Sequence, residues 1–90
     1  MLRIKSFLCS GAVESKLEAK HRVSRAEIES VGAGDPFFLR HKDLFIMLGR
    51  TDGGRYLFVL LRCLGRSTAR IITAHEMTSR ERGTFQGLVG

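Results

Sequence analysis

The chain has 90 residues, 43% of them hydrophobic, which predicts a single domain over residues 1–90 that folds rather than stays disordered. No apolar run approaches the roughly 20 residues of a membrane-spanning helix, and residues 6–13 are too short and too interrupted for a secretory signal. The two cysteines, Cys9 and Cys63, make no disulfide framework, so we expect free thiols in a reducing cytoplasm and no membrane association.

The chain is strongly basic, with a formal net charge of +6. Eleven of its 15 cationic side chains are arginines, whose planar fork suits phosphate and carboxylate groups. Residues 35–90 carry nine basic and five acidic groups, against six and four in residues 1–34, so most of the excess lies in the second part. This composition indicates RNA, DNA or an acidic protein as a partner and leaves the choice among them open.

Two helices are predicted first. Residues 12–22 have apolar side chains one turn apart and charged side chains on the other faces. Ser24-Arg25-Ala26-Glu27 has the pattern of a capping box, which starts a second helix. Val23 and Ile28 stand at the two positions that pack together across such a helix start. The second helix should end near Gly32-Ala33-Gly34.

Strands are predicted after Asp35-Pro36. An Asp-Gly-Gly tip at residues 52–54 lies between two continuous apolar runs and indicates a hairpin. The predicted strands are Phe37–Arg40 at an edge, Leu44–Leu48, Tyr56–Leu61 and Arg70–Ala74. The order helix, helix, meander, helix describes an α+β domain whose helices cover a three- to four-stranded antiparallel sheet.

A third helix is predicted from Thr78, because Thr78 and Glu81 form a second capping-box pattern. The boundary between strand and helix gathers four side chains suited to a phosphodiester site: Arg70, His75, Arg80 and Arg82. Alternation along the last strand divides its residues, with Arg70, Ile72 and Ala74 on one face and Ile71, Thr73 and His75 on the other.

His75 stands at a strand end, where functional groups are common, and an imidazole can act as acid or base at neutral pH. A structural role is the alternative. Glu76 would point away from His75 and is a poor orienting partner. His21 suits the end of the first helix electrostatically and is the reserve acid or base. A charge inside an apolar strand, as at Arg70, indicates either a sheet edge or a site.

A metal centre and a phosphate loop are not supported by the sequence. His21, His41 and His75 have no metal-ligand spacing. The glycines around residues 49–54 lack the phosphate-loop pattern and do not stand between a strand and a helix. We therefore expect no cofactor.

Several short motifs between Val13 and Phe85 suggest a family by their order and spacing. They are Lys20-His21-Arg22-Val23-Ser24 with Glu27, Asp35-Pro36, Leu48-Gly49-Arg50-Thr51, Gly54-Arg55-Tyr56-Leu57-Phe58-Val59, Arg70-Ile71-Ile72-Thr73-Ala74 and Met77-Thr78 with Glu81-Arg82. Together they resemble the BrnT family of toxins from bacterial type II toxin–antitoxin systems.

The resemblance implies a RelE-like ribonuclease fold and cleavage of messenger RNA, which arrests translation. It also implies a cognate ribbon-helix-helix antitoxin that neutralises the toxin and represses the shared operon, so that DNA is contacted only through the antitoxin. Assembly as a homodimer or as a toxin–antitoxin hetero-oligomer stays open. The chain departs from the family pattern at Arg22, often glycine, at His75, often arginine, and at Phe85, often tyrosine; the N-terminal tryptophan motif is also missing.

The residues and the resemblance together predict a metal-independent endoribonuclease, in which the RNA 2′-hydroxyl attacks the adjacent phosphate. The predicted catalytic residues are His75, Arg70 and His21. The predicted nucleic-acid-binding residues are Lys20, Arg50, Arg55 and Arg82. The alternative is a non-catalytic basic module that binds RNA or an acidic protein, for example a degenerate homologue of the toxins, because the sequence itself displays no clear acid–base pair.

Overall fold

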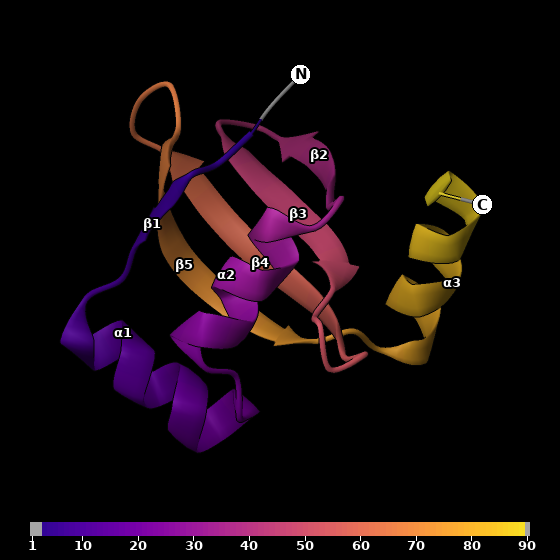
Figure 1. Ribbon diagram of the computed structural model, residues 1–90, viewed down its shortest axis with the longest axis horizontal. Coiled ribbons are helices and arrows are strands. Elements are labelled where there is room, and N and C mark those ends of the chain that lie inside the picture. The colour runs from indigo at the N-terminus through magenta and orange to yellow at the C-terminus, as the bar shows by residue number, and fades with distance from the viewer. Residues whose placement is uncertain (1–2, 90) are drawn as a thin grey trace.

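The computed structural model describes residues 3–89, which form a five-stranded sheet flanked by helices (Figure 1). In chain order the elements are β1 (Ser6–Leu8), α1 (Gly11–Lys16), the π-helix η1 (Leu17–His21), α2 (Arg25–Ala33), β2 (Phe37–His41), β3 (Leu44–Arg50), β4 (Tyr56–Cys63), β5 (Thr68–Glu76) and α3 (Ser79–Val89). In this described part of the chain, no helix is long and apolar enough to cross a membrane. The predicted α+β class is confirmed.

The sheet has the strand order β1-β5-β4-β3-β2 and is mixed. Strands β2 to β5 form the predicted antiparallel meander, but β1 pairs in parallel with β5. The prediction of a purely antiparallel sheet of three or four strands is therefore wrong, as is a fold that begins with helices. A strand of three residues is too short to show alternation, and the polar Cys9-Ser10-Gly11 segment directly after it hides the apolar signal.

The start of α2 is fixed by the predicted capping box. The Ser24 hydroxyl accepts a hydrogen bond from the Glu27 amide at 3.1 Å, and the Glu27 carboxylate accepts one from the Ser24 amide at 3.1 Å. Val23 and Ile28, the pair predicted to pack across the helix start, are fully buried in one cluster. The helix ends at Ala33 with Gly34 as its C-cap, as predicted.

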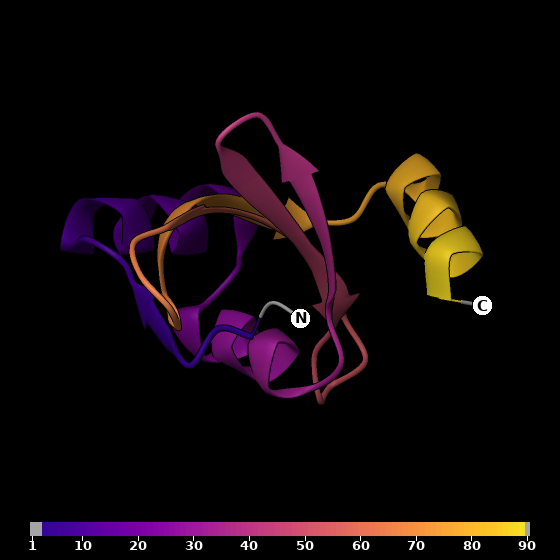
Figure 2. The same ribbon diagram turned by 90° about the horizontal axis from the view of Figure 1, so that it is seen from above.

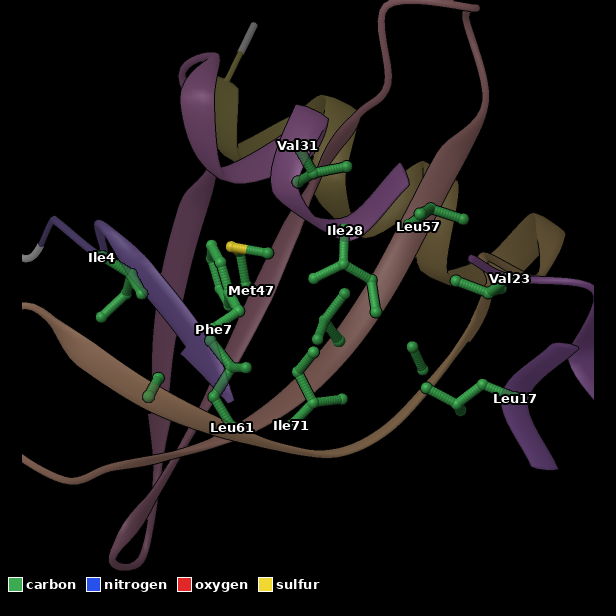
Figure 3. Packing of buried hydrophobic residues seen from close by; sticks show 13 residues of the cluster. Ile4, Phe7, Leu17, Val23, Ile28, Val31, Met47, Leu57, Leu61 and Ile71 are labelled. Atoms are coloured by element: carbon green, nitrogen blue, oxygen red, sulfur yellow. The ribbon is translucent and has the colours of Figure 1, made fainter. Parts of the chain in front are cut away.

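Two apolar clusters lie on the two faces of the sheet. The larger one fills the space under α1, η1 and α2, and Figure 3 shows Ile28 and Val31 pointing into it from α2. Burial of such a side chain contributes roughly 1.5–3 kcal/mol. Figure 2 shows α3 on the other side of the sheet, where a smaller cluster contains Leu48, Met77 and Phe85. The sheet thus lies between α2 and α3 (Figure 2).

The first predicted helix, residues 12–22, forms in two consecutive segments. α1 begins after the N-cap Ser10, whose hydroxyl accepts a hydrogen bond from the Val13 amide at 3.2 Å. The helix then widens into the π-helix η1. This segment ends at its C-cap Arg22, which has the left-handed angles φ 54° and ψ 39°. A 3.6-residue pattern cannot distinguish a π-helical segment from an α-helix, so the sequence gives no sign of this change.

An irregularity in β5 changes the predicted placement of its side chains. The pairing with β4 shifts by one residue and skips Ile72. Ile71 and Ala74, which simple alternation places on opposite faces, both lie in the larger cluster. Their neighbours Arg70 and His75 therefore share the other face, and the predicted assignment of faces is wrong. A bulge of this kind inserts one residue into one strand and reverses the alternation beyond it.

The start of α3 is held by the second predicted capping box. The Thr78 amide donates to the Glu81 carboxylate at 2.9 Å, and the Glu81 amide donates to the Thr78 hydroxyl at 3.1 Å. Just before it, the Met77 amide donates to the Tyr56 carbonyl at 2.9 Å. These bonds fix the first turn of α3 against the ends of β4 and β5.

Candidate active site

His75 and Glu81 form an imidazole–carboxylate pair where β5 gives way to α3. His75 Nε2 lies 3.0 Å and 3.2 Å from the two Glu81 carboxylate oxygens. Although burial raises the pKa of Glu81, hydrogen bonds from the Thr78 amide and from His75 outweigh burial and hold this pKa below its ordinary value of 4.5. Glu81 is therefore ionised at neutral pH, where it can orient the imidazole and stabilise an imidazolium.

Two other rings lie beside this imidazole. Phe58 pairs with His75 in the β4–β5 register, and the two rings stack with centroids 4.6 Å apart. The ring of His21, at the end of η1, has its centroid 6.3 Å from that of His75. Glu76 turns toward Arg55, at 3.6 Å, rather than toward His75. The fold thus brings the two candidate histidines together, and Glu81, not Glu76, is the carboxylate in contact with His75.

The phenol ring of Tyr56 lies on the same face as His75, and two arginines lie against this ring. It precedes Phe58 by two residues in β4, so alternation directs both side chains to one side of the sheet. The guanidinium carbon of Arg82 lies 4.3 Å from the Tyr56 ring centroid, and that of Arg50 lies 5.9 Å from it. Phe85 is buried and packs edge-on against Tyr56 with centroids 5.9 Å apart. Phe85 is therefore part of the core, and the Tyr56 ring lies against it and the two guanidinium groups.

Arg55 ties η1, α2 and β5 together next to the histidines. Its Nη1 donates to both Glu27 carboxylate oxygens at 2.9 Å and to the Arg22 carbonyl at 2.7 Å, and its Nη2 donates to the His21 carbonyl at 3.4 Å. Its Nε lies 3.6 Å from Glu76. Although burial raises the pKa of Glu27, hydrogen bonds, first among them those from Arg55, hold this pKa below its ordinary value. Arg55 is thus committed to internal partners.

A cleft of about 290 Å³ opens between the β3–β4 hairpin and the start of α3. Its lining residues are Glu27, Thr51, Gly53, Gly54, Arg55, Tyr56, Glu76 and Arg82. Gly54 has a φ of +90°, which is why the tip of the hairpin needs glycine. A larger cleft, of about 420 Å³, lies between α2 and β2 and shares none of these lining residues. Neither cleft is lined by a histidine, but the smaller one contains Tyr56 and Arg82 and is therefore the one next to the His75–Glu81 pair.

Arg70 lies apart from the other candidates. It pairs with Leu8 of β1 and stands five residues before His75, which corresponds to roughly 15 Å along the strand. Lys20, in contrast, directly precedes His21 in η1 and is exposed. Of the seven candidate residues named from the sequence, five lie around the end of β5, Lys20 directly precedes one of them, and Arg70 lies at the β1 side of the sheet.

The sequence did not lead us to expect Tyr56 and Glu81 among the residues gathered here. Glu81 was expected only as a helix cap, but its carboxylate caps α3 and contacts His75 at once. The capping box was the available signal, because it places a carboxylate in the turn that follows His75. Tyr56 reads in the sequence as the first residue of an apolar run, and only the packing of α3 brings Arg82 over its ring.

The site has the groups for acid–base and electrostatic catalysis. Within residues 3–89, no group of three or more His, Cys, Asp or Glu side chains is arranged to hold a metal ion. Cys9 and Cys63 are both free and partly buried. What the arrangement offers is a carboxylate-paired imidazole, a second imidazole nearby and arginines around a phenol, a set that can move protons and stabilise an anion.

Comparison with known proteins adds one finding about the fold. No protein-family model matches the sequence, and no curated protein matches it. The structure matches the crystal structure of the ribonuclease toxin BrnT from Brucella abortus with a TM-score of 0.63, over 88% of this chain and 100% of that chain. The two sequences are 16% identical, so the likeness is one of fold. The chain therefore has a BrnT-like fold.

Proposed function

We propose that the protein is an endoribonuclease and the toxin of a type II toxin–antitoxin system, which cleaves RNA and so arrests translation. The observation that carries the proposal is the His75–Glu81 pair. The imidazole of His75 can act as acid or base, and the Glu81 carboxylate lies within hydrogen-bond distance of it. The cations around Tyr56 stand beside it, where a phosphodiester would need them. The likeness in fold to a ribonuclease toxin supports this assignment.

In the proposed reaction, His75 accepts the proton of the RNA 2′-hydroxyl, and the O2′ atom forms a bond to the adjacent phosphorus. The bond from phosphorus to O5′ breaks, which leaves a 2′,3′-cyclic phosphate and a 5′-hydroxyl. His21 donates the proton to the leaving O5′, because a separation of 6.3 Å between the two rings leaves room for a phosphate oxygen within reach of each. The nucleophile belongs to the RNA, so the reaction as proposed needs no metal-bound water.

The arginines and lysine have different roles in this proposal. Arg82 and Arg50 stabilise the negative charge that develops on the phosphate, and Lys20 supports the strand near His21. Arg70 binds a phosphate farther along the RNA, since it lies at the other end of β5. Arg55 positions the end of η1 rather than contacting RNA, because its guanidinium is already bound to Glu27 and to the Arg22 carbonyl.

The products of RNA cleavage test this mechanism. Purified protein is incubated in EDTA with a single-stranded RNA and with the same sequence carrying 2′-O-methyl groups throughout. We expect cleavage of the RNA alone, with cyclic-phosphate and 5′-hydroxyl ends. Cleavage that leaves 5′-phosphates, or cleavage of the 2′-O-methyl strand, would contradict attack by the 2′-hydroxyl.

A toxin requires a neutralising partner, and we propose a cognate antitoxin with a ribbon-helix-helix part, through which alone the complex contacts DNA. Light scattering of the protein, alone and mixed with the product of a gene adjacent to its own, distinguishes a homodimer from a toxin–antitoxin hetero-oligomer. A protein that stays monomeric and binds no such product would contradict this part of the proposal.

One observation favours a second candidate function, a basic RNA-binding module without catalysis. The carboxylates of Glu27 and Glu76 line the same cleft as Arg82 and would repel a phosphate that entered it deeply, so RNA would be held only by the exposed cations Arg50 and Arg82 at its rim. Such a module would bind RNA with an affinity that falls steeply with salt and would leave the RNA intact.

A further inference from the structure

Arg22 ends η1 in a conformation that glycine adopts readily and arginine does not. Its φ of 54° and ψ of 39° lie in the left-handed region, where the Cβ atom of an L-residue meets the backbone. Within residues 3–89, Lys42 in the turn between β2 and β3 is the one other non-glycine residue with a positive φ. The chain therefore keeps two cationic side chains at positions where glycine would be less strained.

The surrounding contacts hold the backbone at Arg22 in place. Its carbonyl accepts a hydrogen bond from Arg55 at 2.7 Å, and the carbonyl of His21 accepts another at 3.4 Å. The next residue, Val23, is fully buried, and its amide donates to the Leu17 carbonyl at 3.2 Å. These contacts involve the backbone of residue 22 and not its side chain, so a glycine there would keep the same geometry.

The fold makes no use of the Arg22 side chain. The side chain is exposed, and in the described part of the chain its guanidinium forms no hydrogen bond or ion pair. The nearby carboxylates of Glu27 and Glu76 are both paired with Arg55 instead. Arg22 thus places an unpaired cation directly after His21, whose ring centroid lies 6.3 Å from that of His75.

We propose that Arg22 is a substrate-binding residue that contacts a backbone phosphate of RNA beside the two histidines, an inference that rests on the proposed function. Strain that persists because neighbouring contacts over-determine it is characteristic of functional positions, and so are π-helical turns such as η1. A phosphate is the ligand that fits, because a guanidinium binds two of its oxygens at once. Arg22 then acts on RNA affinity and not on proton transfer.

The substitution Arg22→Gly tests this, and Lys42→Gly is its matched control. Each change removes one positive charge and puts glycine at a position with left-handed backbone angles. The control residue Lys42 lies in the β2–β3 turn, at the opposite end of β3 from Arg50 and the cleft. The ligand is a single-stranded 2′-O-methyl oligonucleotide, which lacks the nucleophile and so stays intact during titration. Binding is measured at several salt concentrations, and unfolding in urea is measured for each variant.

We expect both variants to unfold at a higher urea concentration than the wild type, because each loses backbone strain. Only Arg22→Gly should bind the oligonucleotide more weakly. Loss of one phosphate contact lowers the salt slope of log affinity by about 0.7, which corresponds to about an eightfold loss near 0.05 M salt and about threefold near 0.2 M.

The outcomes separate this inference from the proposed function. If the wild type cleaves RNA and Arg22→Gly binds the oligonucleotide as well as Lys42→Gly does, the inference about Arg22 is wrong and the ribonuclease assignment stands. If both variants weaken binding equally, the effect is one of net charge, and the inference is wrong as well. A wild type that neither cleaves nor binds RNA would overturn both. A lowered urea midpoint for Arg22→Gly would refute the argument from strain.

Discussion

Replacement of Arg55 by alanine should destabilise the domain more than loss of any exposed ion pair. The guanidinium of Arg55 joins three elements, since it contacts Glu27 in α2, Glu76 in β5 and the carbonyls at the end of η1. Its removal leaves the partly buried Glu27 carboxylate without its counter-ion and leaves the carbonyls of His21 and Arg22 without their donor.

The magnitude should lie between those of exposed and buried ion pairs. The side chains of Arg55 and Glu27 are 27% and 30% exposed. Exposed pairs contribute about 0–1 kcal/mol, and removal of one partner of a buried pair costs about 3–5 kcal/mol. We therefore expect Arg55→Ala to lower the free energy of unfolding by about 2 kcal/mol, midway between the two. In a domain of this size that lowers Tm by about 10 °C.

Thermal and urea unfolding measure the effect, and Arg62→Ala is the matched control. Arg62 also contacts a carboxylate, Asp43, at 3.2 Å, but the two side chains are 47% and 76% exposed. We expect the Arg62 variant to lose less than about 0.5 kcal/mol. Equal losses for the Arg55 and Arg62 variants would refute the reasoning, because they would show that the network around Arg55 adds nothing to an ordinary surface pair.

The pH dependence of the Arg55 effect has a defined sign. The pKa of Glu27 is lowered in the folded protein from its ordinary value of 4.5. Its pairing therefore stabilises the fold fully above pH 4.5, and this stabilisation is lost as the pH falls through the lowered pKa. The difference in stability between wild type and Arg55→Ala should be constant near neutral pH and should shrink in acid below the ordinary pKa. A difference that grows in acid would contradict the pairing.

Three further substitutions test the site and the packing. Glu81→Gln keeps a side chain that can cap α3 but removes the charge beside the imidazole, so cleavage should fall at least about tenfold with little change in Tm; an unchanged rate would exclude Glu81 from the mechanism. Tyr56→Phe keeps the ring beside Arg82 and loses a hydroxyl that could donate a hydrogen bond to the phosphate in the proposed reaction, so we expect roughly tenfold slower cleavage of RNA by a normally stable protein; full activity would show that this hydroxyl is dispensable. Gly49→Ala brings a Cβ atom to 2.7 Å from Val31 Cγ1 and should cost about 1–3 kcal/mol in urea unfolding, whereas Gly65→Ala, with nothing within 4 Å, should cost far less.

The parts of the fold that local sequence determines were predicted correctly. Both capping boxes form as their four-residue patterns indicate, and Gly34 ends α2. The hairpin forms around Gly54, whose positive φ the Asp-Gly-Gly pattern anticipates. Each of these features depends on atoms within a few residues of one another, so no knowledge of the tertiary structure is needed.

The features that were missed depend on contacts between distant segments. β1 becomes a strand because Phe7 packs into the core and its backbone pairs with β5, which three residues of sequence cannot reveal. The bulge that skips Ile72 follows from the fit of β5 to β4, and it places Arg70 and His75 on one face.

Most of the residues proposed for the site lie near one another in the fold, but the contacts among them were not predicted. His75 and His21 were singled out separately, and the fold places their rings side by side. Arg55 was expected to contact nucleic acid, but the approach of Glu27 and Glu76 from other elements gives it internal partners. Such pairings join residues far apart in sequence, and composition and spacing carry no information about them.

The most direct test of the ribonuclease proposal compares His75→Ala with His41→Ala in an RNA cleavage assay in EDTA. His41 is exposed at the end of β2 and is a matched loss of one imidazole outside the site. The proposal predicts that His75→Ala cleaves at least about a hundredfold more slowly while it binds the 2′-O-methyl strand normally, and that His41→Ala cleaves at the wild-type rate. Cleavage by His75→Ala at the wild-type rate, or no cleavage by the folded wild type, would contradict it.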